Sequence, residues 1–332
     1  MIFHPIIIAL YVSSVLITLM VIYASFYGIQ ILRRWDIRSG SELQLILERK
    51  TYLISTLLIY AFGCELLSLF LYVFTADHLH TFFAGAMCAA GSLYANGYGY
   101  PALLMKIINF LFAGVWLVLN YADNRGYDYP LIKKKYLLLL VLAPLVATEM
   151  IVQANYFLRL RPNIITSCCG SLFSADGNGV ISEILLLPGI PMTAGFYCSL
   201  LVFAFCGVYY VLRGKGAYLF ASVTALAFLI SMMSLITCIS VYFYELPTHH
   251  CPFCILQGEY GYIGYPLYLT LFGGTIAGIG VGTLMPFRRI HSLAEIIPSL
   301  QRKLALASLI LFSIFGAIVT HRILASGLVL RG

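Results

Sequence analysis

Eight separate stretches of mainly apolar residues constrain the fold of this chain more than any other feature. A helix of roughly 20 apolar residues crosses a hydrocarbon core of about 30 Å. Such stretches are expected to be helical, because a helix satisfies its own backbone hydrogen bonds in lipid. Their approximate limits are 5–31, 52–75, 101–121, 136–157, 191–212, 217–245, 262–285 and 304–326.

The composition indicates the same class of protein. Of the 332 residues, 61% are hydrophobic and 10% are charged, against about 45–50% and 25% in soluble domains. The whole chain, 1–332, is therefore predicted to be a single all-α domain, a polytopic integral membrane helical bundle in contact with the lipid bilayer.

The basic residues predict how the spans are oriented. Fifteen of the 20 Lys and Arg residues fall in alternate loops, and such clusters mark the cytoplasmic side. Both termini are therefore expected outside the cytoplasm, in a plasma membrane or a prokaryotic inner membrane. Because topology accounts for the net charge of +7, no nucleic-acid partner is expected. The fifteen are Arg33, Arg34, Arg38, Arg49, Lys50, Arg125, Lys133, Lys134, Lys135, Arg213, Lys215, Arg288, Arg289, Arg302 and Lys303.

The nine cysteines divide by position. Four lie inside predicted spans, where cysteine usually acts as a small apolar side chain. The other five lie in loops on the predicted extracytoplasmic face, where disulfides form and persist. An odd number of cysteines argues against a purely structural set of disulfides. The five are Cys88, Cys168, Cys169, Cys251 and Cys254.

The loops that carry these five cysteines resemble one another. Each runs from a cysteine through Gly, Ser or Tyr positions to a Gly-x-Pro, and a proline in a helix's first turn lacks only an N–H that needs no partner. This pattern suggests a three-fold repeat of hairpins, about 52–121, 136–212 and 217–285, between single flanking spans at 5–31 and 304–326. The three cysteine loops should then converge on one outer cavity.

Cys251 and Cys254 form a CxxC pair in 249-HHCPFC-254. The spacing allows a small disulfide ring, and a thiolate at a helix N-terminus beside His249 or His250 suits reversible exchange. A static disulfide is the alternative. Imidazole and thiolate together also suit Zn or Cu.

Two further groups are candidates for the same chemistry. Cys168 and Cys169 are adjacent, which favours a strained and labile disulfide or a soft-metal site, with static pairing to Cys88 as the alternative. His78 and His80, in 77-DHLH-80, are candidate metal ligands or ordinary interfacial polar residues. Haem c is not expected because no CxxCH occurs, and haem b is not expected because no histidine lies near mid-membrane.

Three charged residues fall inside apolar spans, where ionisable groups are costly and usually functional. Glu65, Glu149 and Lys106 are candidates for a proton path or a quinone-headgroup site. Lys106 could either snorkel to the interface or pair with one of the carboxylates. No GxxxxGK[ST] loop occurs, so no nucleotide is expected, and the glycines of 273–282 are expected to let helices pack closely.

The cysteine loop 88-CAAGSLYANGYGYPALL-104, with a CxxC at the start of a later span, resembles the vitamin K epoxide reductase and DsbB group of membrane thiol oxidoreductases. The resemblance implies a helical bundle that holds a quinone near Cys251 and Cys254. It also implies that Cys168 and Cys169, or Cys88 with one of them, pass oxidising equivalents to a partner.

Three functions remain open on the sequence. The first is a membrane redox protein, a thiol–disulfide or quinone-linked oxidoreductase. The second is a Cu- or Zn-binding or transport protein with an outer Cys/His site. The third is a membrane anchor subunit of a respiratory complex, which would dock an extracytoplasmic protein partner.

Overall fold

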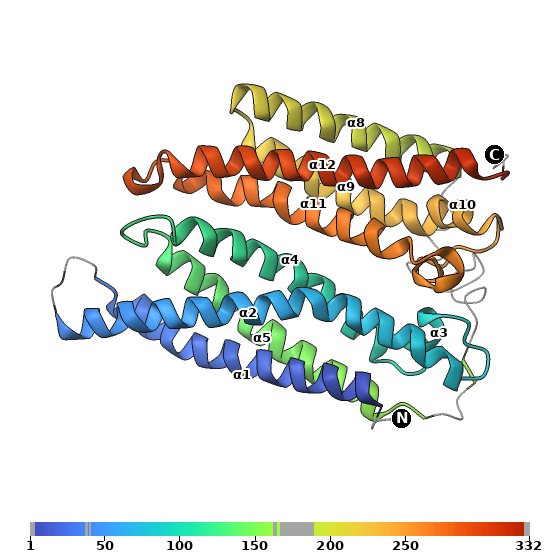
Figure 1. Ribbon diagram of the computed structural model, residues 1–332, viewed down its shortest axis with the longest axis horizontal. Helices are drawn as coiled ribbons and strands as arrows, with labels where there is room; N and C mark the ends of the chain where they lie inside the picture. The colour runs from blue at the N-terminus through green and yellow to red at the C-terminus, as the bar shows by residue number, and fades with distance from the viewer. Residues whose placement is uncertain (1–3, 37–38, 40, 162–164, 167–188, 329–332) are drawn as a thin grey trace. The chain divides into compact units, whose positions relative to one another are not determined.

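The computed structural model describes all residues except 1–3, 37–38, 40, 162–164, 167–188 and 329–332 (Figure 1). Among the described residues, regular secondary structure is helical, apart from one isolated bridge between Ala84 and Ile165. Eight helices in this described part are long and apolar enough to cross a membrane. The predicted class, an all-α integral membrane protein, is therefore confirmed.

Every predicted span coincides with one of these helices. Helix α2 begins at Glu42 instead of near residue 52, because good helix formers such as Glu, Leu and Arg continue it beyond its apolar part. The bounds are α1 Pro5–Arg34, α2 Glu42–His78, α4 Gly99–Asp123, α5 Ile132–Leu158, α8 Gly189–Arg213, α9 Ala217–Ser234, α11 Gly264–Leu284 and α12 Ile296–Ala325. A π-helical turn η2 (Leu235–Ile239) and α10 (Ser240–Tyr244) continue the span that α9 begins.

Short helices connect the spans. They are η1 Leu79–Phe82, α3 Ala89–Tyr94, η3 Cys254–Leu256, η4 Gly258–Tyr260, η5 Met285–Phe287 and η6 His291–Leu293. The Gly-x-Pro entry signal is found at the start of three long helices, since α4, α8 and α11 begin at Gly99, Gly189 and Gly264. Each proline is thus the third helical residue, where its missing N–H needs no partner.

The chain forms two compact units, each assembled from separate segments. Unit 1 contains residues 1–73, 96–160 and 283–300, and unit 2 contains residues 74–95, 161–282 and 301–332. Helix α5 packs against α1 and α4 in unit 1, and α8 packs against α9 in unit 2.

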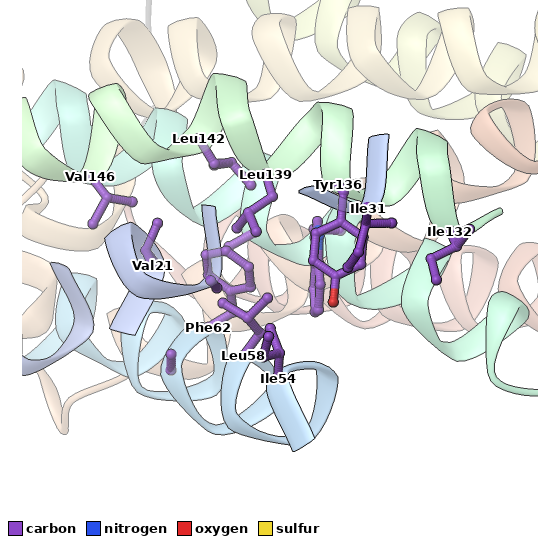
Figure 2. Close-up of a cluster of buried hydrophobic side chains, with 14 of the residues drawn as sticks. Val21, Ile31, Ile54, Leu58, Phe62, Ile132, Tyr136, Leu139, Leu142 and Val146 are labelled. Atoms are coloured by element: carbon purple, nitrogen blue, oxygen red, sulfur yellow. The ribbon is translucent and has the colours of Figure 1, made fainter. Parts of the chain in front are cut away.

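The core of unit 1 is an apolar cluster built from α1, α2, α4 and α5 (Figure 2). Ile54, Leu58 and Phe62 repeat every four residues on α2 and so present one face. The Phe62 ring meets the Trp116 ring of α4 at a centroid distance of 5.0 Å. Large apolar side chains elsewhere on these helices are exposed, as lipid contact requires.

In unit 2, glycines on α11 allow close helix packing, as predicted for 273–282. A Cβ at Gly278 would lie 2.5 Å from the Thr224 side chain of α9, and one at Gly282 would lie 2.5 Å from Ala221. Small residues four apart are the usual device by which membrane helices approach closely.

Candidate functional site

Three cysteines meet in the interior of unit 2. The sulfurs of Cys88, Cys251 and Cys254 all lie within 4.8 Å of one another. Cys88 and Cys251 are fully buried and Cys254 is 5% exposed. The Cys88 and Cys251 sulfurs are 3.5 Å apart, which is a non-bonded contact because a disulfide is about 2.05 Å long. The structure thus brings Cys88 to the CxxC pair, while Cys168 and Cys169 lie outside the described residues.

The Cys88 segment is held in place by Asp77, near the end of α2. The Asp77 carboxylate accepts hydrogen bonds from the backbone N–H of Ala89 (3.1 Å) and from the Gln257 side chain (3.0 Å). Gln257 also donates to the backbone carbonyl of Met87 (3.0 Å). One carboxylate therefore ties the residue after Cys88 to the loop that follows Cys254.

A glycine fixes the chain just before Cys88. The backbone N–H of Thr166 donates to the carbonyl of Ala84 at 3.0 Å. Gly85 has φ of +88°, and a Cβ there would lie 2.4 Å from the Thr166 carbonyl oxygen. Glycine is therefore required at this position, both for its backbone conformation and for the close approach.

Two tyrosines clamp the CxxC loop. The Tyr244 hydroxyl donates to the carbonyl of Cys251 (2.5 Å) and accepts from the N–H of Ile255 (3.0 Å). The Tyr268 hydroxyl donates to the carbonyl of Pro252 (2.7 Å). The backbone on both sides of the pair is thus fixed by side chains that the sequence did not single out.

The CxxC does not begin a membrane span, so that prediction was wrong. Cys254 begins only the short η3 helix, η4 follows, and α11 starts at Gly264. Gly261 and Tyr262 have φ of 65° and 56°, a left-handed conformation that interrupts a helix. A helix dipole therefore does not stabilise a thiolate at Cys251 in the way the sequence suggested.

The two adjacent histidines have different roles. The His249 Nε2 atom lies 3.4 Å from the Cys254 sulfur, and its ring meets the Tyr244 ring edge-on. The His250 Nδ1 atom lies 3.2 and 3.1 Å from the carbonyl oxygens of Ile236 and Thr237, so Nδ1 donates its proton there. These carbonyls belong to the π-helical turn η2. Burial lowers the pKa of His250, which keeps its ring neutral.

The other predicted histidine ligands are not grouped with the three sulfurs. His78 stacks on Phe74, and His80 contacts the backbone carbonyl of Asp77 through Nδ1. Within the described part of the chain, one group of three or more metal-ligating atoms is close enough to share an ion, and it consists of Cys88, Cys251 and Cys254. None of the four predicted histidine ligands belongs to that group.

A cavity of about 600 Å³ gives access to Cys254 and His249. Its other lining residues are Asp77, His80, Ala86, Met87, Gln257, Gly258, Glu259 and Tyr260. A second cavity of about 680 Å³ shares Glu259 and Tyr260 with the first and is lined further by Phe243, Gly261, Ile263, Ala317, Ile318, His321 and Arg322. Burial raises the pKa of Tyr260, so its hydroxyl stays protonated between the two cavities.

The three charged residues predicted inside the membrane also meet, in unit 1. The Lys106 Nζ atom lies 2.5 Å from the Glu149 Oε1 atom, and Asn109 donates to Glu149 Oε2 at 2.5 Å. Glu65 lies close enough to Glu149 for the two carboxyl groups to interact electrostatically. Lys106 is 1% exposed, so it pairs with a carboxylate and does not snorkel.

A second buried ion pair was missed. The sequence predicts Lys135 in a cytoplasmic loop, but α5 begins at Ile132 and buries Lys135 completely. Its Nζ atom lies 2.7 Å from Asp123 Oδ2, 3.1 Å from Asn120 Oδ1 and 3.2 Å from Ser55 Oγ. Lys135 is therefore part of the helix packing and is not a loop marker of topology.

Comparison of the chain with family models, with curated proteins and with solved structures found no match.

Proposed function

We propose that the protein is a membrane thiol–disulfide oxidoreductase whose reactive centre is Cys88, Cys251 and Cys254. The observation that supports this most directly is the 3.5 Å contact between the sulfurs of Cys88 and Cys251, beside the CxxC partner Cys254. A third cysteine in contact with a CxxC pair allows a disulfide to move from one pair to the other by direct exchange.

The exchange step balances without any external oxidant. The Cys88 thiolate attacks the Cys251 sulfur of a Cys251–Cys254 disulfide. A Cys88–Cys251 bond forms, the Cys251–Cys254 bond breaks, and Cys254 leaves as a thiolate. His249, with its Nε2 atom 3.4 Å from that sulfur, stabilises the leaving group by hydrogen bonding or by protonating it.

Exchange with a substrate takes place at Cys254, because Cys254 lines the 600 Å³ cavity. A substrate thiolate attacks the Cys254 sulfur of the Cys251–Cys254 disulfide, and Cys251 leaves as a thiolate. A second substrate thiol then displaces Cys254 and closes the substrate disulfide. The substrate loses two electrons and two protons, and the pair becomes a dithiol.

A lipid-soluble quinone is the proposed oxidant that restores the disulfide. The dithiol gives two electrons and two protons to the quinone, which becomes the quinol. The second cavity fits such an acceptor, because apolar Phe243, Ile263 and Ile318 line it together with Arg322 and it shares Tyr260 with the cysteine cavity. We also propose that this site lies on the extracytoplasmic face of the membrane and that it exchanges disulfides with an extracytoplasmic protein partner.

Trapping of the cysteines in native membranes tests this function. Full-length protein is treated with dithiothreitol or with an oxidised quinone, quenched in acid, alkylated and mapped by mass spectrometry. We expect disulfides that join Cys251 to Cys254 and to Cys88, both of which disappear on reduction. Cys88→Ser should retain only the Cys251–Cys254 disulfide, and Cys64→Ser, on an exposed face of α2, should behave as the wild type. Cysteines that never change state would refute the proposal.

Binding of a soft metal ion is the second candidate, and the grouping of the three sulfurs favours it. Zn–S bonds of about 2.3 Å place two thiolates of a tetrahedral site about 3.8 Å apart, close to the 3.5 Å between Cys88 and Cys251. Three thiolates also suit Cu(I). In this case His249 would have to reorient to supply a fourth ligand, because it contacts only Cys254 among the three.

Metal analysis separates the two candidates. Stoichiometric Zn or Cu in gently purified protein, lost in Cys88→Ser and retained in Cys64→Ser, would favour the metal site. Absence of metal together with exchangeable disulfides would favour the oxidoreductase.

A further inference from the structure

The buried polar group of unit 1 contains one more carboxyl group than it has cations to balance it. It contains one lysine, Lys106, and two glutamates, Glu65 and Glu149, and all three are at most 3% exposed. With every group ionised, the site would hold one uncompensated negative charge. A buried charge without a partner is strongly destabilising, so a buried group neutralises itself by taking up a proton.

The contacts indicate which carboxyl takes the proton. Both oxygens of Glu149 accept hydrogen bonds, Oε1 from Lys106 and Oε2 from Asn109, each at 2.5 Å. Donors on both oxygens favour the ionised form of Glu149. Glu65 lies close to Glu149, and its own Oε1 atom has no hydrogen-bond partner. A buried carboxyl oxygen without a donor disfavours the ionised form, so the carboxyl that takes the proton is Glu65.

Among the described residues, the side chains that face this group supply no further charge. Ser68 and Tyr72 face the group from α2, with the Ser68 hydroxyl 3.1 Å from Lys106 Nζ and the Tyr72 hydroxyl donating to the Gly99 carbonyl. From α5, Tyr156 is the further titratable residue near Tyr72. Helix α1, which packs on α5, has no charged residue before Arg33.

We propose that Glu65, Glu149 and Lys106 form a proton-binding site within the membrane, and that Glu65 holds one proton that exchanges with water. The ligand is a single proton. The proposal does not depend on the chemistry of the cysteines, which lie in unit 2.

Infrared spectroscopy of the full-length protein in liposomes tests the site directly, because a protonated carboxyl group has its own C=O stretching band. We expect such a band in the wild type and its downshift on transfer to D2O. Glu65→Gln should remove it. Glu42→Gln, at an exposed position at the start of the same helix, should leave it unchanged.

Two further variants keep Glu65 and change its charged neighbours. They therefore test the protonation of Glu65 without removing it. Glu149→Gln leaves Lys106 with Glu65 as its only carboxylate, so Glu65 should ionise and the band should disappear. Lys106→Met leaves two carboxyls without a cation, so both should be protonated and the band should grow roughly two-fold.

Three outcomes would overturn the proposal. A band that persists in Glu65→Gln would place the proton elsewhere, and a band that persists in Glu149→Gln would contradict the charge balance. A band that does not shift in D2O would mean that the proton is locked in place. Each of these leaves the cysteine trapping result unaffected, so failure here is distinguishable from failure of the proposed oxidoreductase.

Discussion

Unit 1 contains two buried lysines in similar ion pairs, and the groups around them differ in charge. Lys135 lies 2.7 Å from Asp123, and Lys106 lies 2.5 Å from Glu149. The Lys135 group has one positive and one negative member, whereas the Lys106 group has a second carboxyl, Glu65. Both pairs are at most 2% exposed in their side chains.

The charge-balanced pair, Lys135 and Asp123, has hydrogen-bond partners on the backbone as well as on other side chains. Asp123 Oδ1 accepts the N–H of Leu131 at 2.7 Å, while Lys135 donates to Asn120 and Ser55. This arrangement joins the end of α4, the start of α5 and the middle of α2. A charge-balanced pair with these partners acts as a structural connection, whereas an unbalanced group must bind a proton to stay neutral.

The largest expected effect is that of Lys135→Met. It leaves Asp123 buried without its cation and removes a donor from Asn120 and Ser55. Removing one partner of a buried pair typically lowers the free energy of unfolding by about 3–5 kcal/mol. Equilibrium unfolding in mixed detergent micelles measures the loss.

Lys134→Met is the matched control, because Lys134 is adjacent and exposed on the same helix. Its effect should be within about 0.5 kcal/mol. Equal losses for Lys134→Met and Lys135→Met would contradict a structural role for the Lys135–Asp123 pair.

Lys135 shows that residue type alone does not predict burial. Three consecutive lysines, Lys133 to Lys135, look alike as topology markers, but the turn of α5 exposes the first two and buries the third. The signal was present, since Lys135 falls at helical spacing with the buried residues Ile132, Leu139 and Leu142. The length of the apolar run does not show this burial, because the run itself begins only after the three lysines.

The spans themselves could be predicted because the length of an apolar run is a local property. The cysteine site could be predicted only in part. The CxxC and its adjacent histidine are visible in sequence, but the contact between Cys88 and Cys251 joins residues 163 positions apart. Tyr244 and Tyr268 belong to no local motif, and nothing in 77-DHLH-80 marks Asp77 as a supporting group, so only the folded chain shows that the three hold this loop.

Lys106→Met should have a smaller effect that depends on pH. Glu149 keeps its hydrogen bond to Asn109 and can take up a proton, so the expected loss near neutral pH is about 1–3 kcal/mol. The folded variant holds protons on both glutamates, whereas unfolded glutamates with a pKa of about 4.3 are ionised. The folded state therefore binds more protons, and its stability should fall as pH rises.

Unfolding of Lys106→Met at about pH 5 and about pH 8 checks that sign. The deficit relative to wild type should be smaller at the lower pH. A deficit that is the same at both values, or larger at low pH, would show that the lost lysine is not replaced by a bound proton.

The smallest expected effect is that of Glu65→Gln, which sharpens the contrast between the two groups. The neutral amide takes the place of the protonated carboxyl, and the Lys106–Glu149 pair remains balanced and buried. The change in the free energy of unfolding should therefore be about 1 kcal/mol or less, measured as for the lysine variants. The matched change in the balanced group is Asp123→Asn, which leaves Lys135 without an anion and should be far more destabilising. If Glu65→Gln proves as destabilising as Asp123→Asn, Glu65 is ionised in the wild type. The Lys106 group would then depend on each of its charges, as the Lys135 group does.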